Sequence, residues 1–306
     1  MSSAPRRILR LPAVWLFLFA LGACDGSPAR PIIDDPVSPM DTEPAWSPDG
    51  RSLLYTHAAQ SSAESALGAF QIWRLDLATG NRQYLTAGKS ATWSPDGGHI
   101  ALIDGYRLVV MDLATKTKRP IGPNAPSFQP AWSPDGRWIA YHASYGPLVG
   151  FNAIYLINPD GTELKDISEH TSGQWNQARW SPDSQWLVHR RYLEGAEAEL
   201  FVMDTTGAQP LRLTHDHADD RDPAWSPDGE WIVWGFFPSP SDEAGLWLMR
   251  PDGSDRRLLI AGGFNPSWAP DGSRIAFSYS ASPDSAATIW SIEPDGSDLA
   301  RLIVPE

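Results

Sequence analysis

Cysteine is almost absent from this sequence of 306 residues, since Cys24 is the only one. A disulfide within the chain is therefore excluded. Long apolar runs are also lacking: residues 11–21 form an uninterrupted run of only eleven, whereas crossing a bilayer takes about 20 residues. Helical periodicity is missing as well, which points away from helical fold classes.

Positive charge is scarce. The chain has 24 Lys and Arg against 37 Asp and Glu, a formal net charge of −13. Removing residues 1–23 takes away three arginines and no acidic residue, which leaves a net charge of −16. Nucleic acids and anionic lipid headgroups need a basic face, so neither is expected as a partner. A cation, a neutral glycan or a basic protein surface remains compatible with this charge.

Catalytic motifs are lacking too. The sequence has no G-x-S-x-G elbow, no phosphate-binding glycine loop and no H-E-x-x-H helix, so no enzyme of those classes is predicted. An enzyme would have to assemble a site from other residues, for which Glu43, Asp222 and His215 are the available acids and histidine.

The N-terminal segment has the features of an export signal. Arg6, Arg7 and Arg10 precede the apolar run, which ends in Leu21-Gly22-Ala23-Cys24. This ending resembles a bacterial lipobox, which implies cleavage after residue 23 and acylation of Cys24. Proline-rich residues 24–40 are then expected to be a flexible tether, and the protein to be anchored rather than membrane-spanning.

Three alternatives stay open for this segment. Cys24 can instead be an ordinary buried or surface cysteine beside a conventional signal peptide. Arg6-Arg7 is the pair that twin-arginine export requires, but the residues that follow it fit that signal poorly. Asp25 after the cysteine resembles an inner-membrane retention signal, a rule that varies between bacterial groups, so inner and outer membranes both remain possible. Either way, we predict a location on the periplasmic side of the envelope.

A five-residue motif recurs six times. Trp-Ser-Pro-Asp-Gly begins at Trp46, Trp93, Trp132 and Trp225, and one-residue variants begin at Trp180 and Trp268. The successive spacings are 47, 39, 48, 45 and 43 residues. Repeats of this period indicate a fold built from stacked, equivalent units.

Each repeat contains the pattern of four short strands. Seven residues after the Trp comes an apolar run such as Leu53-Leu54-Tyr55, typical of a strand buried on both faces. An alternating segment follows, then a turn such as Asn158-Pro159-Asp160-Gly161 and a last short strand. The pattern predicts an all-β, six-bladed propeller over residues 41–306, with four antiparallel strands per blade. The blades follow sequence order, so no strand remains to lock the ring, although residues 31–33 are a candidate addition to the last blade.

The motif itself has a structural explanation. Proline presets the turn, Asp can hydrogen-bond the local backbone, and Gly accepts a positive φ. The Trp is expected to wedge between neighbouring blades. The repeated aspartates are therefore predicted to be scaffold: Asp49, Asp96, Asp135, Asp183, Asp228 and Asp271.

These repeats resemble those of the TolB-like propeller family of bacterial periplasmic proteins, over nearly all of residues 41–306. The resemblance implies the fold and a tendency to bind proteins. TolB carries an additional α/β domain before its propeller and is soluble in the periplasm. Here only residues 25–40 separate Cys24 from the first repeat, so the resemblance does not extend to the Tol–Pal system.

Polar residues stand three positions before each motif Trp. We predict that they line the mouth of the central channel and call them the mouth ring: Glu43, Ser90, Gln129, Gln177, Asp222 and Asn265. The alternative is a set of ordinary solvated loop residues. One position before the Trp, other blades have small residues but blade four has Arg179, which either binds a carboxylate in the channel or pairs structurally with an acidic neighbour.

Histidines near blade five suggest a second kind of site. His215 and His217 share a side of an extended chain, so they can form half of a divalent-cation site, with Asp219 or Asp222 supplying oxygen. A solvated loop explains the same residues, and no cofactor is otherwise predicted. His189-Arg190-Arg191 is interpreted as a polar blade edge rather than a site with a catalytic base.

The sequence thus predicts a monomeric, lipid-anchored binding module that recognises an envelope protein through its channel mouth. The long connections at 58–70, 143–153, 192–199 and 236–245 are expected to contribute to the binding surface. The alternative is a glycan or small-ligand binder, or a lyase or hydrolase, with a site in the channel that can depend on a metal.

Overall fold

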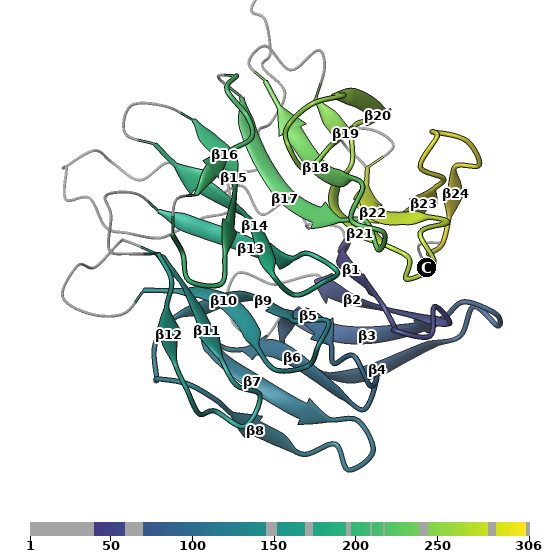
Figure 1. Cartoon of the computed structure of the whole chain (residues 1–306). Coiled ribbons are helices and arrows are strands. Elements are labelled where there is room, and N and C mark those ends of the chain that lie inside the picture. The colour runs from purple at the N-terminus through teal and green to yellow at the C-terminus, as the bar shows by residue number, and fades with distance from the viewer. Residues whose placement is uncertain are drawn as a thin grey trace, which may run out of the picture.

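Six antiparallel sheets of four strands each are arranged around a central axis (Figure 1). The structure is a computed structural model that describes residues 40–58, 70–144, 152–168, 174–193, 197–208, 210–216, 218–238, 244–280 and 286–303. In every sheet the strands follow one another in sequence order, and the innermost strands of neighbouring sheets contact each other around the ring. The predicted six-bladed, all-β propeller is therefore confirmed.

The first three blades are made by residues 40–166. Blade 1 contains β1 (Met40–Trp46), β2 (Ser52–Ala58), β3 (Phe70–Asp76) and β4 (Arg82–Ala87). Blade 2 contains β5 (Lys89–Trp93), β6 (His99–Asp104), β7 (Arg107–Asp112) and β8 (Lys118–Pro120). Blade 3 contains β9 (Ser127–Trp132), β10 (Ile139–Ala143), β11 (Ala153–Ile157) and β12 (Lys165–Asp166).

The other three blades complete the ring. Blade 4 contains β13 (Trp175–Trp180), β14 (Trp186–Tyr192), β15 (Ala198–Asp204) and β16 (Leu211–Arg212). Blade 5 contains β17 (Asp219–Trp225), β18 (Ile232–Phe237), β19 (Gly245–Met249) and β20 (Arg257–Ala261). Blade 6 contains β21 (Phe264–Trp268), β22 (Ile275–Tyr279), β23 (Thr288–Ile292) and β24 (Ala300–Arg301).

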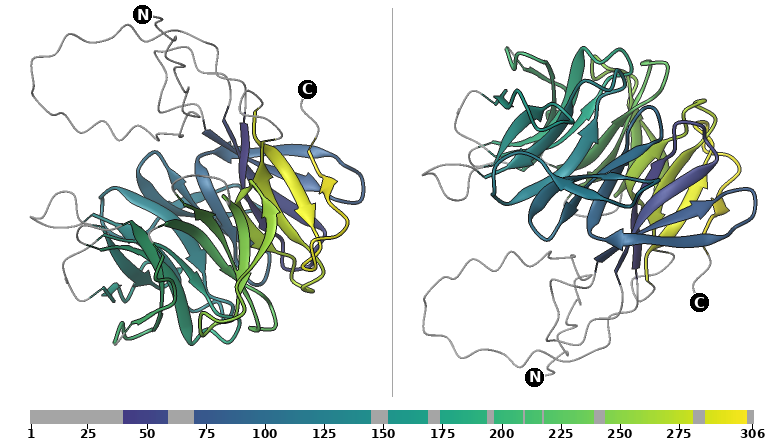
Figure 2. Two further views of the ribbon diagram at one scale, coloured as in Figure 1. Left: turned by 90° about the horizontal axis from the view of Figure 1, so that it is seen from above. Right: turned by 90° about the horizontal axis from the view of Figure 1, so that it is seen from below.

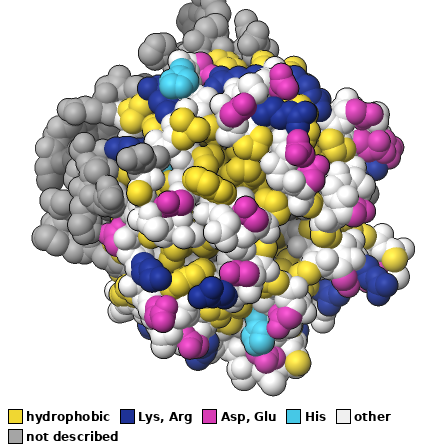
Figure 3. All heavy atoms as spheres, in the orientation of Figure 1, with side chains coloured by type: hydrophobic (Ala, Val, Ile, Leu, Met, Phe, Trp, Pro, Cys, Tyr) yellow, Lys and Arg dark blue, Asp and Glu magenta, His cyan; other side chains and the backbone are white. Residues whose placement is uncertain are grey.

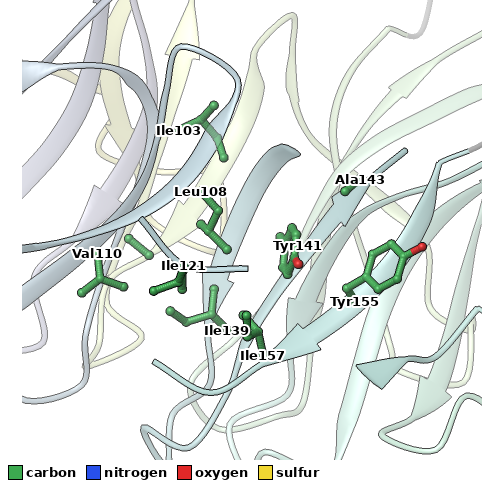
Figure 4. Close-up of a cluster of buried hydrophobic side chains, with 10 residues drawn as sticks. Ile103, Leu108, Val110, Ile121, Ile139, Tyr141, Ala143, Tyr155 and Ile157 are labelled. Carbon is green, nitrogen blue, oxygen red and sulfur yellow. The ribbon is translucent and has the colours of Figure 1, made fainter. Parts of the chain in front are cut away.

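The core lies between the blades. The second and third strands of each blade supply most of the buried apolar side chains, which pack against neighbouring sheets. Between blades 2 and 3, for example, Ile103 and Leu108 meet Ile139 and Tyr141 in one buried cluster (Figure 4). Burial of this kind of surface is the main favourable contribution to folding.

The motif turns are held by their own Ser and Asp. In blade 1, Ser47 Oγ donates to Asp49 Oδ1 (2.6 Å) and accepts from Ser52 N (2.9 Å). Asp49 Oδ1 also accepts from Arg51 N (3.0 Å). The hydrogen bond from Ser47 and that from the Arg51 backbone hold the pKa of Asp49 below its ordinary value. The same bonds recur in blades 2 to 5, which confirms the scaffold role of the repeated aspartates.

The motif tryptophans reach the preceding blade, as predicted, in three cases. The indole nitrogens of Trp93 and Trp180 donate to the carbonyl oxygens of Ala45 (3.1 Å) and Ala131 (3.0 Å). Trp132 differs, because its indole donates to Gly136 O of its own turn (3.3 Å). The third case, Trp46, closes the ring.

Blades 1 and 6 lie side by side without sharing a strand (Figure 2). Trp46 Nε1 donates to Ser267 O (3.1 Å), and the backbone N–H of Asp41 donates to Ala287 O (2.9 Å). Gly50, at φ 69°, brings its backbone against the Pro270 ring of the last motif turn. Residues 31–33, the candidate addition to the last blade, lie outside the described residues, as do Cys24 and all other residues before Met40.

Hydrophobic side chains gather near the centre of one face of the ring, with acidic and basic side chains scattered around them (Figure 3). Within the described ranges, no helix has the length and apolar character that crossing a membrane requires.

Candidate functional site

All six mouth-ring residues lie on the innermost strands, at one equivalent position in each blade. Their φ angles are between 45° and 55°, in the left-handed region that few residues other than glycine adopt. Each stands where the pairing of the first and second strands shifts register, which is a β-bulge. The six residues are therefore equivalent bulge residues of the innermost strands.

The bulges join neighbouring blades. Ser90 N donates to Glu43 Oε2 of blade 1 (3.0 Å), and Asp222 N donates to Gln177 Oε1 of blade 4 (3.0 Å). Glu43 N donates to Ser278 Oγ of blade 6 (3.2 Å), which ties the first blade to the last. A bulge leaves one backbone N–H out of its own sheet, and here the preceding blade satisfies it. Sequence reasoning missed this role, although the shared polarity at a fixed offset was a signal for it.

Within the mouth ring, some side chains are occupied and others are not. Glu43 accepts hydrogen bonds from Ser90 Oγ (2.9 Å) and Thr56 Oγ1 (2.8 Å), and Asp222 accepts one from Gln177 Nε2 (2.5 Å). The half-buried carboxamides of Gln129 and Asn265 form no side-chain hydrogen bond with any described residue. The ring therefore presents two unoccupied amides, each of which can both donate and accept.

Arg179 lies on β13 of blade 4, two residues after the mouth-ring residue Gln177. Its Nη1 donates to Ala178 O (3.0 Å) and, in a long contact, to Gln129 O (3.5 Å). Burial lowers the pKa of Arg179, while the negative charges of Asp222 and Glu43 oppose this shift. Neither carboxylate forms an ion pair with Arg179, so the predicted structural pairing with an acidic neighbour does not occur among the described residues.

Asp222 lies in an environment of opposing effects. Burial raises the pKa of its carboxyl group, and the guanidinium groups of Arg179, Arg190 and Arg221 oppose the shift. Arg190 and Arg221 both form ion pairs with Asp219 (Arg221 Nη2 to Oδ2, 2.5 Å). The guanidinium groups of Arg190 and Arg221 also stack on aromatic rings, those of Tyr192 (4.4 Å) and Phe237 (4.7 Å).

A second group of cations and rings comes from blades 1 to 3. Lys89 Nζ lies 5.5 Å from the Phe70 ring and 5.7 Å from the Phe128 ring. Phe128 stacks on His142 at 5.2 Å. Burial lowers the pKa of His142 to about 3, helped by the positive charges of Arg179, Arg190 and Lys89. His142 is therefore neutral at physiological pH, and three cations act on one point near the axis.

Of the residues proposed for a metal, His215 and Asp219 are described, and their surroundings differ. Asp219 is engaged by two arginines, His217 lies outside the described residues, and His215 is exposed in the β16–β17 connection. There His215 lines a cavity of about 490 Å³ with Arg212, Asp252 and Arg256, among others. Among the described residues, no cluster of three or more His, Cys, Asp or Glu is placed to hold a metal ion.

His215 also does not complete an acid–base set. It lines the cavity between the outer part of blade 4 and the β19–β20 turn, whereas Glu43 and Asp222 stand in the mouth ring. The candidate catalytic residues therefore occupy different parts of the fold, since the cavity lining includes neither carboxylate.

The interpretation of His189 as part of a polar blade edge is wrong. His189 is fully buried and stacked between Trp175 (4.7 Å) and Phe201 (5.7 Å). Neither ring nitrogen has a hydrogen-bond partner among the described residues, and burial lowers its pKa to about 3. His189 is thus a neutral core residue, because its strand runs between two blades and not along a surface.

The chain matches the family model of the TolB beta propeller domain over residues 104–299. A protein named "uncharacterized peptidase YuxL" from Bacillus subtilis (strain 168) is 26% identical over 221 residues, which is 66% of this chain and 30% of that protein. This chain therefore spans less than a third of the length of that relative.

Two solved structures are similar in fold. A putative TolB from Agrobacterium tumefaciens superposes with a TM-score of 0.66 at 22% identity, covering 75% of this chain and 86% of that one. TolB from Acinetobacter baumannii gives a TM-score of 0.64 at 18% identity, covering 84% and 61%. At these identities the similarity concerns the fold alone.

Proposed function

Because the chain belongs to the TolB β-propeller family, we propose that it is a protein-binding module of the bacterial envelope, held on the periplasmic side by a lipid on Cys24. The mouth ring is the surface that contacts the partner. The lipid anchor is supported by Leu21-Gly22-Ala23-Cys24, which resembles a lipobox, and the connections at 58–70, 143–153, 192–199 and 236–245 extend the contact surface.

One observation carries the proposal. Four mouth-ring residues are joined to neighbouring blades by side-chain hydrogen bonds, but the amides of Gln129 and Asn265 are left without a partner among the described residues. A half-buried amide without a partner gives up part of its hydrogen bonding to water on folding. No hydrogen bond within the protein replaces what it loses, so the amide does not stabilise the fold. A polypeptide backbone, which offers N–H and C=O groups together, would satisfy both of them.

The test is capture of partners from native membranes. The tagged full chain is crosslinked in the membrane, purified by its tag and analysed by mass spectrometry. The mouth variant is Gln129→Lys with Asn265→Lys, because neither side chain holds the ring together. Glu43→Lys and Asp222→Lys serve less well, since Glu43 and Asp222 bind Ser90 and Gln177 of adjacent blades. Arg137→Ala, at an exposed position after a motif turn, is the matched control.

We expect a specific envelope protein with the wild type and the control, and its loss with the mouth variant. The same set of captured proteins in all three samples would show that the mouth ring is not the binding surface.

A further inference from the structure

Arg179 is the exception among six equivalent positions. The residue before the motif Trp is small in the other blades, namely Ala45, Thr92, Ala131, Ala224 and Ser267. Small residues are expected where six innermost strands converge on the axis. An arginine at this one position places a long, charged side chain where the fold needs none.

The guanidinium of Arg179 is positioned but not neutralised. Backbone carbonyls hold Nη1, whereas Nε and Nη2 have no hydrogen-bond partner among the described residues. The negative charges of Asp222 on blade 5 and of Glu43 on blade 1 both act on it. Both carboxylates already accept hydrogen bonds from other side chains and remain beyond ion-pair distance.

The surroundings add positive charge. Lys89 and Arg190 act together with Arg179 on His142, which itself is neutral. Asp219 is shared by Arg190 and Arg221. With Glu43 and Asp222 counted, the four cations of this region face three carboxyl groups, and burial raises the pKa of one of them, Asp222. A local excess of cations is unusual in a chain whose net charge is −13. A field of this sign attracts an anionic group to the axis.

We propose that Arg179 is the anchor for a carboxylate of the polypeptide partner, and that the amides of Gln129 and Asn265 bind the backbone beside it. The two unpartnered nitrogens, Nε and Nη2, form the planar edge that binds a carboxylate through two parallel hydrogen bonds. The inference rests on the proposed function and names the chemistry of the ligand. The carboxylate comes either from the C-terminus of the partner or from an Asp or Glu side chain.

The experiment uses the full chain, immobilised, and pools of random decapeptides. One pool has a free C-terminal carboxylate and lacks Asp and Glu. A second is amidated at the C-terminus and contains Asp and Glu. A third, amidated and without acidic residues, has no carboxylate. Oligogalacturonate, an acidic glycan, is the probe for a ligand of another class. Binding of the pools to Arg179→Ala and Arg179→Lys is compared with binding to wild type and to the control Arg137→Ala. The Arg179→Ala protein is also tested in the crosslinking experiment on native membranes.

Arg179→Ala should fold normally, since three blades have Ala at this position, and a melting curve checks this. We expect the wild type and Arg137→Ala to retain a carboxylate-bearing pool at least tenfold better than the third pool. Arg179→Ala should lose this preference and the membrane partner. Arg179→Lys, which keeps the charge without the planar edge, should retain an intermediate preference. Preference for the first pool identifies a C-terminal carboxylate, and preference for the second identifies a side chain.

Three results would overturn the inference. If Arg179→Ala captures the membrane partner as well as wild type does while Gln129→Lys with Asn265→Lys does not, the proposed function stands and the carboxylate anchor is refuted. If neither variant affects capture, both fail. If oligogalacturonate is retained in an Arg179-dependent manner and no peptide pool is, the ligand is an acidic glycan and the polypeptide assignment is wrong.

Discussion

Asp220 should make the stability of the propeller depend on pH. Its side chain is fully buried on β17, where Trp234 Nε1 donates to Oδ1 (2.8 Å). Burial raises the pKa of Asp220 to about 8, and the negative charges of Asp216 and Glu199 add to the rise, while hydrogen bonds from Thr214 and Trp234 oppose it. The folded protein therefore keeps this carboxyl group protonated at neutral pH.

The sign and size follow from proton linkage. In the unfolded chain an aspartate has a pKa near 4, so between about pH 4 and pH 8 the folded state binds one more proton than the unfolded state. The stabilising contribution is complete below about pH 4 and is lost as pH rises toward 8. In that interval each pH unit lowers the free energy of unfolding by about 1.4 kcal/mol. From pH 6.5 to pH 8 the loss is about 1.6 kcal/mol, because the slope falls to half its full value at the folded-state pKa.

The perturbation that isolates this group is Asp220→Asn. The amide oxygen keeps the bond from Trp234 and the side chain no longer titrates. Urea unfolding followed by tryptophan fluorescence gives the free energy of unfolding at pH 6.5, 7, 7.5 and 8. The buried histidines His142 and His189 affect the free energy of unfolding equally in both proteins. Their contribution therefore cancels when the variant is compared with wild type at each pH. Asp255→Asn, at an exposed turn, is the charge-matched control and should parallel wild type.

We expect the variant to gain about 1.6 kcal/mol relative to wild type over this range. Parallel pH profiles for the Asp220→Asn protein and the wild type would refute the argument, because they would mean that Asp220 is ionised in the folded state.

Three further changes test other parts of the molecule. Cys24→Ser should move the protein from the membrane fraction to a soluble or uncleaved form, and unchanged fractionation would contradict the lipid anchor. Trp132→Ala should lower the free energy of unfolding by about 3–5 kcal/mol, as large truncations between packed elements do, so a native melting curve would mean that the blade packing is misunderstood. Gly50→Ala places a Cβ at φ 69° and should destabilise the protein by about 1–2 kcal/mol, whereas no change in denaturation midpoint would show that this turn relaxes freely.

The architecture was predictable because it depends on local chemistry that repeats. Ser47 and Asp49 close their turn within six residues, so the motif indicates both the turn and the strands on either side. The run Leu53-Leu54-Tyr55 of β2 is apolar because both faces of the strand meet another blade. Six such units in sequence order leave few arrangements other than a ring.

The candidate site was predictable only in part. A fixed offset from Trp located the mouth ring, but the positive φ of its residues and the bond from Ser90 N to Glu43 depend on how adjacent blades meet. His189 was misinterpreted for the same reason: two arginines follow it, yet its own side chain points between Trp175 and Phe201. The pattern of polar and apolar residues along a strand does not show which side chains of neighbouring strands cover a given residue.

The order of the blades along the chain has a mechanical consequence. Blade 1 begins at Met40, and along β1 the bonds to blade 6 run from Asp41 N–Ala287 O through Glu43 N–Ser278 Oγ to Trp46 Nε1–Ser267 O. Tension on the chain ahead of Met40 therefore loads these bonds one after another, as in peeling, before it strains any other junction between blades. The junction between the first and last blades is therefore the contact between blades that such a force loads first.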